Sequence, residues 1–114
     1  MTAAVKTVIY PATDLREAKA LYSGLLGGIQ PVMDQAYYVQ FNVDGTEIGL
    51  DPHGHSKGMT GPVSYWQVGD IKQTISDLLA TGAKEQQAVT DFGGRLVASV
   101  RDADGNVIGL IQPA

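Results

Sequence analysis

The sequence contains no cysteine, which excludes a disulfide framework, a thiolate metal site and a cysteine nucleophile. Basic residues are few, because eight Lys and Arg stand against twelve Asp and Glu and give a net charge of −4 at pH 7. A nucleic-acid-binding protein would carry a positive excess instead. No apolar run approaches the roughly 20 residues of a membrane-spanning helix, and no signal-peptide pattern opens the chain. We therefore expect a cytoplasmic protein that binds neither nucleic acid nor membranes.

Glycine, in contrast, is abundant, with 14 among 114 residues, against an average usage of about 7%. Such a content predicts many tight turns or places where backbone segments approach closely. A chain of this length fits one domain and can bury a core without a metal or a disulfide.

An internal repeat organises the chain. Residues 44–50 read DGTEIGL and residues 104–110 read DGNVIGL, which match at five of seven positions. Residues 12–15 align in the same way with residues 68–71. The repeat predicts two consecutive modules of similar structure.

Each module reads as a strand, a helix and three further strands. β-Branched and aromatic runs predict first strands at 7–10 and 63–68. Helices are expected from N-cap residues Asp14 and Asp70 to the stops at Gly27-Gly28 and Gly82. The remaining strands are expected near 30–33, 37–43, 47–50, 84–89, 95–101 and 107–112, with hairpin turns at Asp44-Gly45 and Asp104-Gly105-Asn106.

The predicted fold is α+β, with tandem βαβββ modules that form a curved mixed sheet around a cleft. We expect a single domain over 1–114, with module 1 at about 4–52, a linker at 53–61 and module 2 at 62–114. Because the side chains of a strand alternate between the two faces of the sheet, every second residue is assigned to the face that packs against the helices. Trp66 belongs to this set and is expected in the core. The other parity is assigned to the cleft: Thr7, Ile9, Pro11, Glu47, Gly49, Asp51, Val63, Tyr65, Gln67, Val107, Gly109 and Ile111.

This pattern resembles the vicinal oxygen chelate superfamily, which contains glyoxalase I, bleomycin-resistance proteins and extradiol dioxygenases. The resemblance covers nearly the whole chain and rests on three features. These are the tandem modules, the helix run with Asp14, Leu15, Ala18, Leu21, Tyr22, Leu26 and Gly27, and the closing segment 102–110. Members of this fold include lyases, isomerases, dioxygenases and drug-sequestering proteins. The resemblance is therefore more specific for the fold than for the function.

In metal-dependent members, the first and last strands of each module supply the ligands of a divalent ion. The resemblance places these ligand positions at Thr7, Gly49, Val63 and Gly109. Glycine and valine have no donor side chain and a neutral threonine hydroxyl is a poor ligand, so we expect no metal and no other cofactor. The two glycines are interpreted as leaving room for an organic ligand, or alternatively as marking bulges or close strand contacts.

The leading hypothesis is a metal-independent small-molecule binding protein of the glyoxalase/bleomycin-resistance type that sequesters a drug or metabolite. Its expected ligand-binding residues are Thr7, Ile9, Glu47, Gly49, Val63, Tyr65, Gln67 and Gly109. The resemblance also implies a homodimer, and leaves open whether modules pair within one chain or between two. The alternative is a lyase or isomerase in which Glu47, Asp51 or His55 acts as the base.

Each catalytic candidate also has a structural interpretation. His53 and His55 lie in a Gly-rich linker that favours exposed positions. Glu47 and Asp51 can be solvated carboxylates at a strand end.

Two further segments have both a structural and a ligand-related interpretation. Tyr37, Tyr38 and Phe41 are expected in one strand, with Tyr37 and Phe41 on one face, either as core or as ligand-stacking residues. Residues 91–95 resemble a mobile loop that closes over ligands, and equally fit a plain hairpin.

Overall fold

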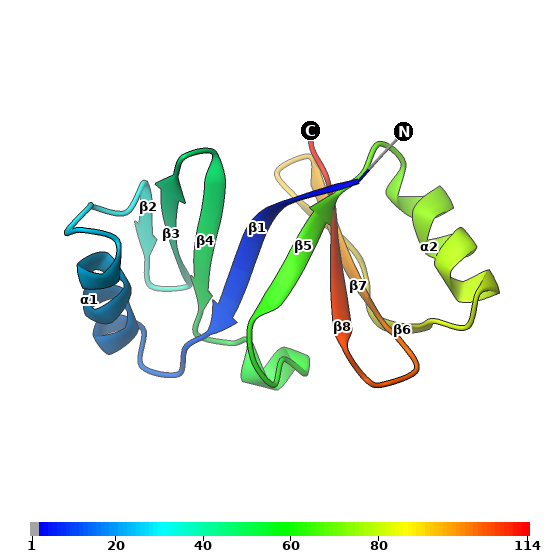
Figure 1. Ribbon diagram of the computed structural model, residues 1–114, viewed down its shortest axis with the longest axis horizontal. Helices are drawn as coiled ribbons and strands as arrows, with labels where there is room; N and C mark the ends of the chain where they lie inside the picture. The colour runs from blue at the N-terminus through cyan, green and yellow to red at the C-terminus, as the bar shows by residue number, and fades with distance from the viewer. Residues whose placement is uncertain (1–2) are drawn as a thin grey trace. The chain divides into compact units, whose positions relative to one another are not determined.

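A computed structural model describes residues 3–114 of the chain, which divide into two compact units. One unit contains residues 7–62, and the other contains residues 63–114 together with residues 3–6. Figure 1 shows one helix and a set of strands in each unit. Within residues 3–114, no helix is long and apolar enough to cross a membrane.

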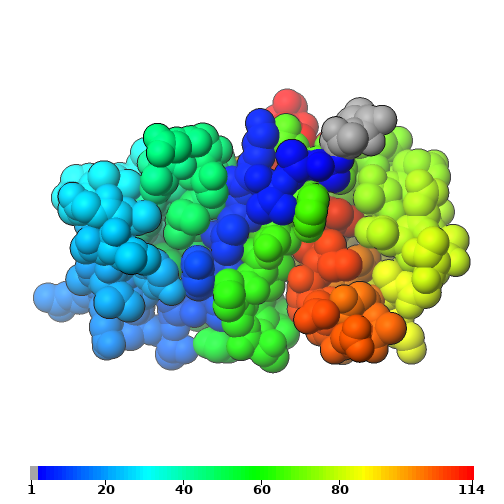
Figure 2. Space-filling model, in the orientation of Figure 1, coloured from blue at the N-terminus to red at the C-terminus, as the bar shows by residue number. Residues whose placement is uncertain are grey.

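The first unit contains one helix and four strands of mixed direction. Its elements are β1 (Ala4–Pro11), of which residues 7–11 belong to this unit, α1 (Leu15–Leu25), β2 (Met33–Gln35), β3 (Tyr38–Val43) and β4 (Thr46–Asp51). The strand order is β2-β3-β4-β1, in which β1 and β4 are parallel and the other neighbours are antiparallel. Figure 2 shows β1, in blue, beside the blue-green β3–β4 hairpin. A short 3₁₀ helix, His55–Lys57, follows β4.

The second unit repeats this arrangement. Its elements are β5 (Val63–Gln67), α2 (Ile71–Ala80), β6 (Lys84–Phe92), β7 (Arg95–Arg101) and β8 (Val107–Gln112). The strand order is β5-β8-β7-β6, with β5 parallel to β8 and antiparallel pairing elsewhere. The mixed strand directions and the one helix in each unit confirm the predicted α+β class and the tandem βαβββ order.

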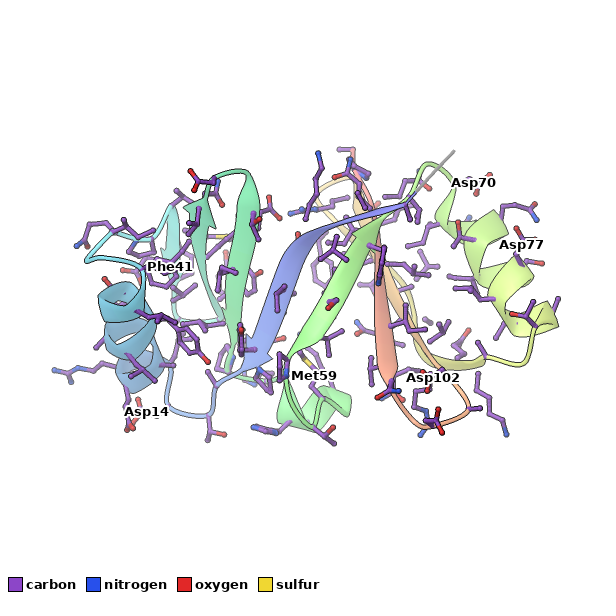
Figure 3. All side chains as sticks on the ribbon, viewed as in Figure 1. Asp14, Phe41, Met59, Asp70, Asp77 and Asp102 are labelled. Carbon is purple, nitrogen blue, oxygen red and sulfur yellow. The ribbon has the colours of Figure 1, made fainter. Side chains whose placement is uncertain are left out.

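Both helices begin where the sequence predicts. The Asp14 carboxylate accepts a hydrogen bond from the backbone N–H of Glu17 at 3.0 Å, and the Asp70 carboxylate accepts one from Gln73 at 3.1 Å. Figure 3 shows the two aspartates at the helix starts. Such N-caps satisfy backbone donors that have no partner inside the helix.

The core of the first unit lies between α1 and one face of its sheet. Val39, Phe41 and Leu50 are buried there and pack with Ala12. Partly buried helix residues, among them Leu15 and Tyr22, cover this cluster. The residues predicted to face the helix therefore do so in this unit. The opposite face of the same strands does not contribute to this core.

The core of the second unit contains Val68, Ile71, Ala98 and Leu110. Trp66 pairs with Leu110 across β5 and β8 but lies outside this cluster and is 38% exposed. The prediction that Trp66 is a core residue is therefore wrong. The physical reason is the reach of the helix, since α2 packs mainly over β6, β7 and β8.

The β2–β3 hairpin also differs from the expectation. Tyr37 lies in the turn before β3 and is 60% exposed, so it does not share a strand face with Phe41. β2 begins at Met33 instead of near residue 30. Pro31 accounts for the late start because proline has no N–H to pair, and the first bond to β3 is donated by Val32 to the Gln40 carbonyl.

The predicted hairpin turn at residues 44–45 is confirmed, since Asp44 and Gly45 both adopt positive φ angles, 49° and 85°. Residues 91–95 form an equally tight turn, with positive φ at Gly93 and Gly94. The Asp91 carboxylate accepts a hydrogen bond from the Gly94 N–H at 2.7 Å. The plain-hairpin interpretation of this segment is therefore the one that the structure supports.

Candidate functional site

The register of β1 and β4 brings several predicted site residues together in the first unit. Thr7 lies opposite Glu47, and Ile9 lies opposite Gly49. All four belong to the parity that alternates with the core residues Ile48 and Leu50. They therefore share the sheet face opposite α1, which we call the Thr7 face.

Thr7 and Glu47 form a side-chain hydrogen bond on the Thr7 face. The Thr7 Oγ1 donates to the Glu47 Oε1 at 2.7 Å, and Thr7 is only 3% exposed. A hydrogen bond from a hydroxyl to a carboxylate is short and stronger than one between neutral groups. The bond fixes the orientation of the Glu47 carboxylate on the sheet.

Gly49 lies in the middle of the Thr7 face, directly beneath the ring of Tyr38. A Cβ placed on Gly49 would lie 2.7 Å from Cζ of Tyr38 and 3.0 Å from its Cε1, and nearer still to the phenol oxygen. Such separations are too short for real carbon atoms, so residue 49 must lack a side chain while the ring is there. The expectation of open space above this glycine is wrong, because the tyrosine ring fills it.

The second unit contains a comparable pair. Tyr65 on β5 lies directly opposite Gly109 on β8, and a Cβ on Gly109 would lie 2.6 Å from Cγ of Tyr65. Tyr65 is buried, with 5% of its surface exposed. The space above Gly109 is thus also filled, which supports the alternative interpretation that the glycines mark close contacts. Val63 shares this strand face and is buried, whereas Gln67 is half-buried.

Asp51 organises the loop that follows β4. One carboxylate oxygen accepts the His53 N–H at 2.8 Å, and the other binds the Lys57 Nζ at 2.8 Å. Only 9% of the Asp51 side chain is exposed. Both oxygens serve loop structure, which favours a structural role over a catalytic one.

The two linker histidines are exposed, as their structural interpretation expects. The Nδ1 atom of His55 lies 3.1 Å from the carbonyl oxygen of Met59, within the same loop. His53 contributes its backbone N–H to Asp51. These contacts place both histidines in the loop architecture.

The residues present do not fit the divalent metal site of the resembling enzymes. Thr7 uses its hydroxyl proton on Glu47, and the other ligand positions hold valine and two glycines covered by tyrosine rings. Across residues 3–114, no group of three or more His, Cys, Asp or Glu side chains is arranged to hold a metal ion. A divalent ion needs several converging nitrogen or oxygen donors, and these positions do not supply them.

Two contacts in this region were not predicted from the sequence. Tyr38 was expected in its strand, but its position over Gly49 depends on the β3–β4 register, which pairs Gln40 with Gly49. Lys57 was not recognised as the partner of Asp51. Asp51 and Lys57 are six residues apart in a Gly-rich loop, and this spacing does not by itself predict an ion pair.

The chain is similar to known proteins at the level of structure. No protein-family model and no curated protein matches the sequence. A glyoxalase/bleomycin resistance protein/dioxygenase superfamily member from Vibrio splendidus is similar, with a TM-score of 0.69, 17% identity, and coverage of 99% of this chain and 100% of that chain.

Two further solved structures are enzymes. Methylmalonyl-CoA epimerase of Streptomyces coelicolor, in complex with 2-nitronate-propionyl-CoA, has a TM-score of 0.72 and 13% identity, with coverage of 100% of this chain and 99% of that chain. The Mn(II)-bound glyoxalase from Novosphingobium aromaticivorans has a TM-score of 0.68 and 17% identity, with coverage of 97% of this chain but 40% of that chain. These likenesses show that the chain has the fold of the vicinal oxygen chelate superfamily, as its βαβββ repeat predicted.

Proposed function

We propose that this chain is a metal-independent small-molecule binding protein of the glyoxalase/bleomycin-resistance type, which sequesters a drug-like compound or a metabolite. One observation carries the proposal. The ligand positions of the fold's metal enzymes here hold a threonine hydroxyl bound to Glu47, a valine, and two glycines beneath tyrosine rings. These groups suit contact with an organic molecule better than coordination of an ion.

The chemistry of the Thr7 face favours a cationic ligand with an aromatic or apolar part. Glu47 supplies a carboxylate held in place by Thr7, and the position over Gly49, where the Tyr38 ring lies, has room for an aromatic or apolar group of similar size. A cation gains from the negative charge of this carboxylate. The net charge of −4 adds a favourable long-range attraction.

A ligand screen in the presence of EDTA tests the proposal. Thermal-shift and native mass spectrometry measurements would compare cationic antibiotics with small keto acids. We expect a cationic compound to bind one per chain without added metal, and Glu47→Gln to weaken it by about tenfold, the loss of one modest polar interaction. Glu85→Gln, in the exposed part of β6, is the matched control for charge. Binding that required a divalent ion would overturn the proposal.

A second candidate is a lyase or isomerase that uses Glu47 as its base. The observation in its favour is that the fold is shared with a methylmalonyl-CoA epimerase. Glu47 is the half-buried carboxylate that faces the predicted ligand positions. Solvent deuterium incorporation into methylmalonyl-CoA, lost in Glu47→Gln, would favour this enzyme over the binding protein.

We also propose a homodimer, which the family resemblance implies, and a cytoplasmic location. Light scattering coupled to gel filtration tests the assembly. A mass of 12.1 kDa at all concentrations would contradict it.

A further inference from the structure

We propose that the ring of Tyr38 is an internal occupant of the ligand position over Gly49, and that it must rotate away before a ligand binds. This inference deepens the proposed function and rests on it. It assigns Tyr38 as the residue that controls entry to the Thr7 face.

The contact between the Tyr38 ring and Gly49 depends on the rotamer of Tyr38. Gly49 lies directly opposite Gln40, and Tyr38 lies two residues earlier on β3, so Tyr38 is a diagonal neighbour of Gly49. A tyrosine at such a position reaches the glycine only by leaning along the strand. The contact is therefore set by the side-chain rotamer and not by strand pairing alone.

Comparison with Tyr65 shows why Tyr38 is the movable ring. Tyr65 stands directly opposite its glycine and is 5% exposed, so it is a fixed cover of the strand. Tyr38 is half-buried and is the first residue of β3, next to the two-residue turn 36–37. A side chain at a strand end has more freedom to change rotamer than one within the strand.

Rotation of the Tyr38 ring leaves the apolar core of the first unit covered. The apolar core of this unit, with Val39 and Phe41, lies on the opposite face of β3. The ring can therefore leave Gly49 without exposing that core. Its departure opens a space the size of a phenol, floored by a glycine and flanked by the Glu47 carboxylate.

The movable ring leads to a binding prediction that needs no knowledge of the natural ligand. Removing the ring by Tyr38→Ala leaves a phenol-sized space, and p-cresol has the shape of the missing side chain. Cavities left by deleted side chains bind small aromatic molecules. We expect Tyr38→Ala to bind p-cresol at least about tenfold more tightly than the wild type, as measured by NMR titration. Tyr38→Phe, which keeps the ring, is the control and should not gain affinity for p-cresol.

The double variant Tyr38→Ala/Gly49→Ala locates the p-cresol site. An added methyl group on the floor should cost most of the gain in affinity, because it takes up the space beneath the ring. Equal p-cresol affinity in Tyr38→Ala and the wild type would overturn the inference. Undiminished affinity in the double variant would also overturn it.

The single variant Gly49→Ala keeps the inference testable if Tyr38→Ala does not fold. Its methyl group cannot coexist with the ring in place, since even Cζ lies 2.7 Å from the added Cβ. A movable ring predicts a folded protein in which the Tyr38 ring signals no longer contact residue 49. An unfolded Gly49→Ala protein, or a ring that stays, would contradict a movable occupant.

The outcomes separate this inference from the proposed function. If Tyr38→Ala binds p-cresol while the wild type binds no compound of the EDTA screen, the ring is an occupant and the proposed function fails. If the wild type binds a cationic compound that Tyr38→Ala binds more weakly, Tyr38 is a direct contact and the inference fails. An increase of affinity in Tyr38→Ala supports both, because the variant no longer spends free energy on moving the ring.

Discussion

Tyr22 on α1 packs its ring against that of Tyr10 on β1, with 4.9 Å between the ring centroids and a 41° tilt between their planes. The pair joins the helix of the first unit to its sheet. Burial raises the pKa of Tyr22 above its usual 10.0, and the neighbouring Tyr10 raises it further.

The Tyr22 shift predicts that the protein loses stability at high pH. A group whose pKa is raised on folding stabilises the native state below its unfolded pKa, here about 10, and this contribution is lost as the pH rises through the folded value. Urea unfolding at pH 8 and above pH 10 measures the effect. The loss should be smaller in Tyr22→Phe, and an equal loss in both proteins would contradict the assignment.

Asp102 should show the opposite dependence, at low pH. Its carboxylate accepts hydrogen bonds from the Asn106 side chain at 3.0 Å and from the Asn106 backbone at 2.8 Å, and these lower its pKa below 3.8. The stabilisation of the β7–β8 turn (Figure 3) is present above the unfolded pKa of about 3.9 and is lost as the pH falls through the folded value.

An NMR titration of the Asp102 carboxyl carbon checks this assignment. Asn106→Ala removes the side-chain donor and should move the Asp102 midpoint back up toward its ordinary value. Asp77→Asn, in the other half of the same unit, is a control that should leave the midpoint unchanged. An unmoved midpoint in Asn106→Ala would contradict the hydrogen-bond explanation.

Removal of the Thr7 hydroxyl should destabilise the first unit. In Thr7→Val the shape of the side chain is kept, but the Glu47 carboxylate loses its donor at 2.7 Å. Hydrogen bonds to charged groups contribute about 1.5–3 kcal/mol, and the lower end is expected because Glu47 is only half-buried. Thr7→Ser keeps the donor and should lose less. A double-mutant cycle with Glu47→Gln measures the coupling, and additive effects would contradict it.

The Asp51 carboxylate should contribute more to the stability of the first unit than Lys57, its cationic partner, does. Asp51→Ala removes the acceptor for both the His53 N–H and Lys57, and should cost about 1–3 kcal/mol while opening residues 52–58 to proteolysis. Lys57→Met should cost below about 1 kcal/mol, because the Lys57 side chain is 43% exposed. Chemical unfolding and limited digestion with proteinase K, which does not need Lys57 as a cleavage site, measure the two effects, and a larger loss in Lys57→Met would contradict this ranking.

Much of the fold could be predicted because its signals are local. The N-caps Asp14 and Asp70 use carboxylates three residues from the N–H that they accept, and the Asp44-Gly45 turn needs positive φ at two adjacent residues. The repeat then sets the order of the elements. Trp66 could not be predicted in this way. Strand alternation places it on the helix-packed face, but whether α2 covers it depends on tertiary packing.

The site was harder to predict because its geometry depends on register. Parity placed Thr7, Glu47 and Gly49 on one face, and the structure agrees. Alternation alone does not reveal that Tyr38 would lean over Gly49, since this needs the pairing of Gln40 with Gly49 and a particular rotamer. A glycine within a strand therefore predicted a special contact, but which side chain fills the space above it depends on the tertiary structure.

Titration of the EDTA-treated protein with Mn(II), Ni(II) and Zn(II), followed by dialysis and metal analysis, tests the central claim most directly. The account predicts that no ion is retained in stoichiometric amount, because Thr7, Gly49, Val63 and Gly109 offer too few donors. One ion retained per chain, and lost in Thr7→Val or Glu47→Gln, would contradict it.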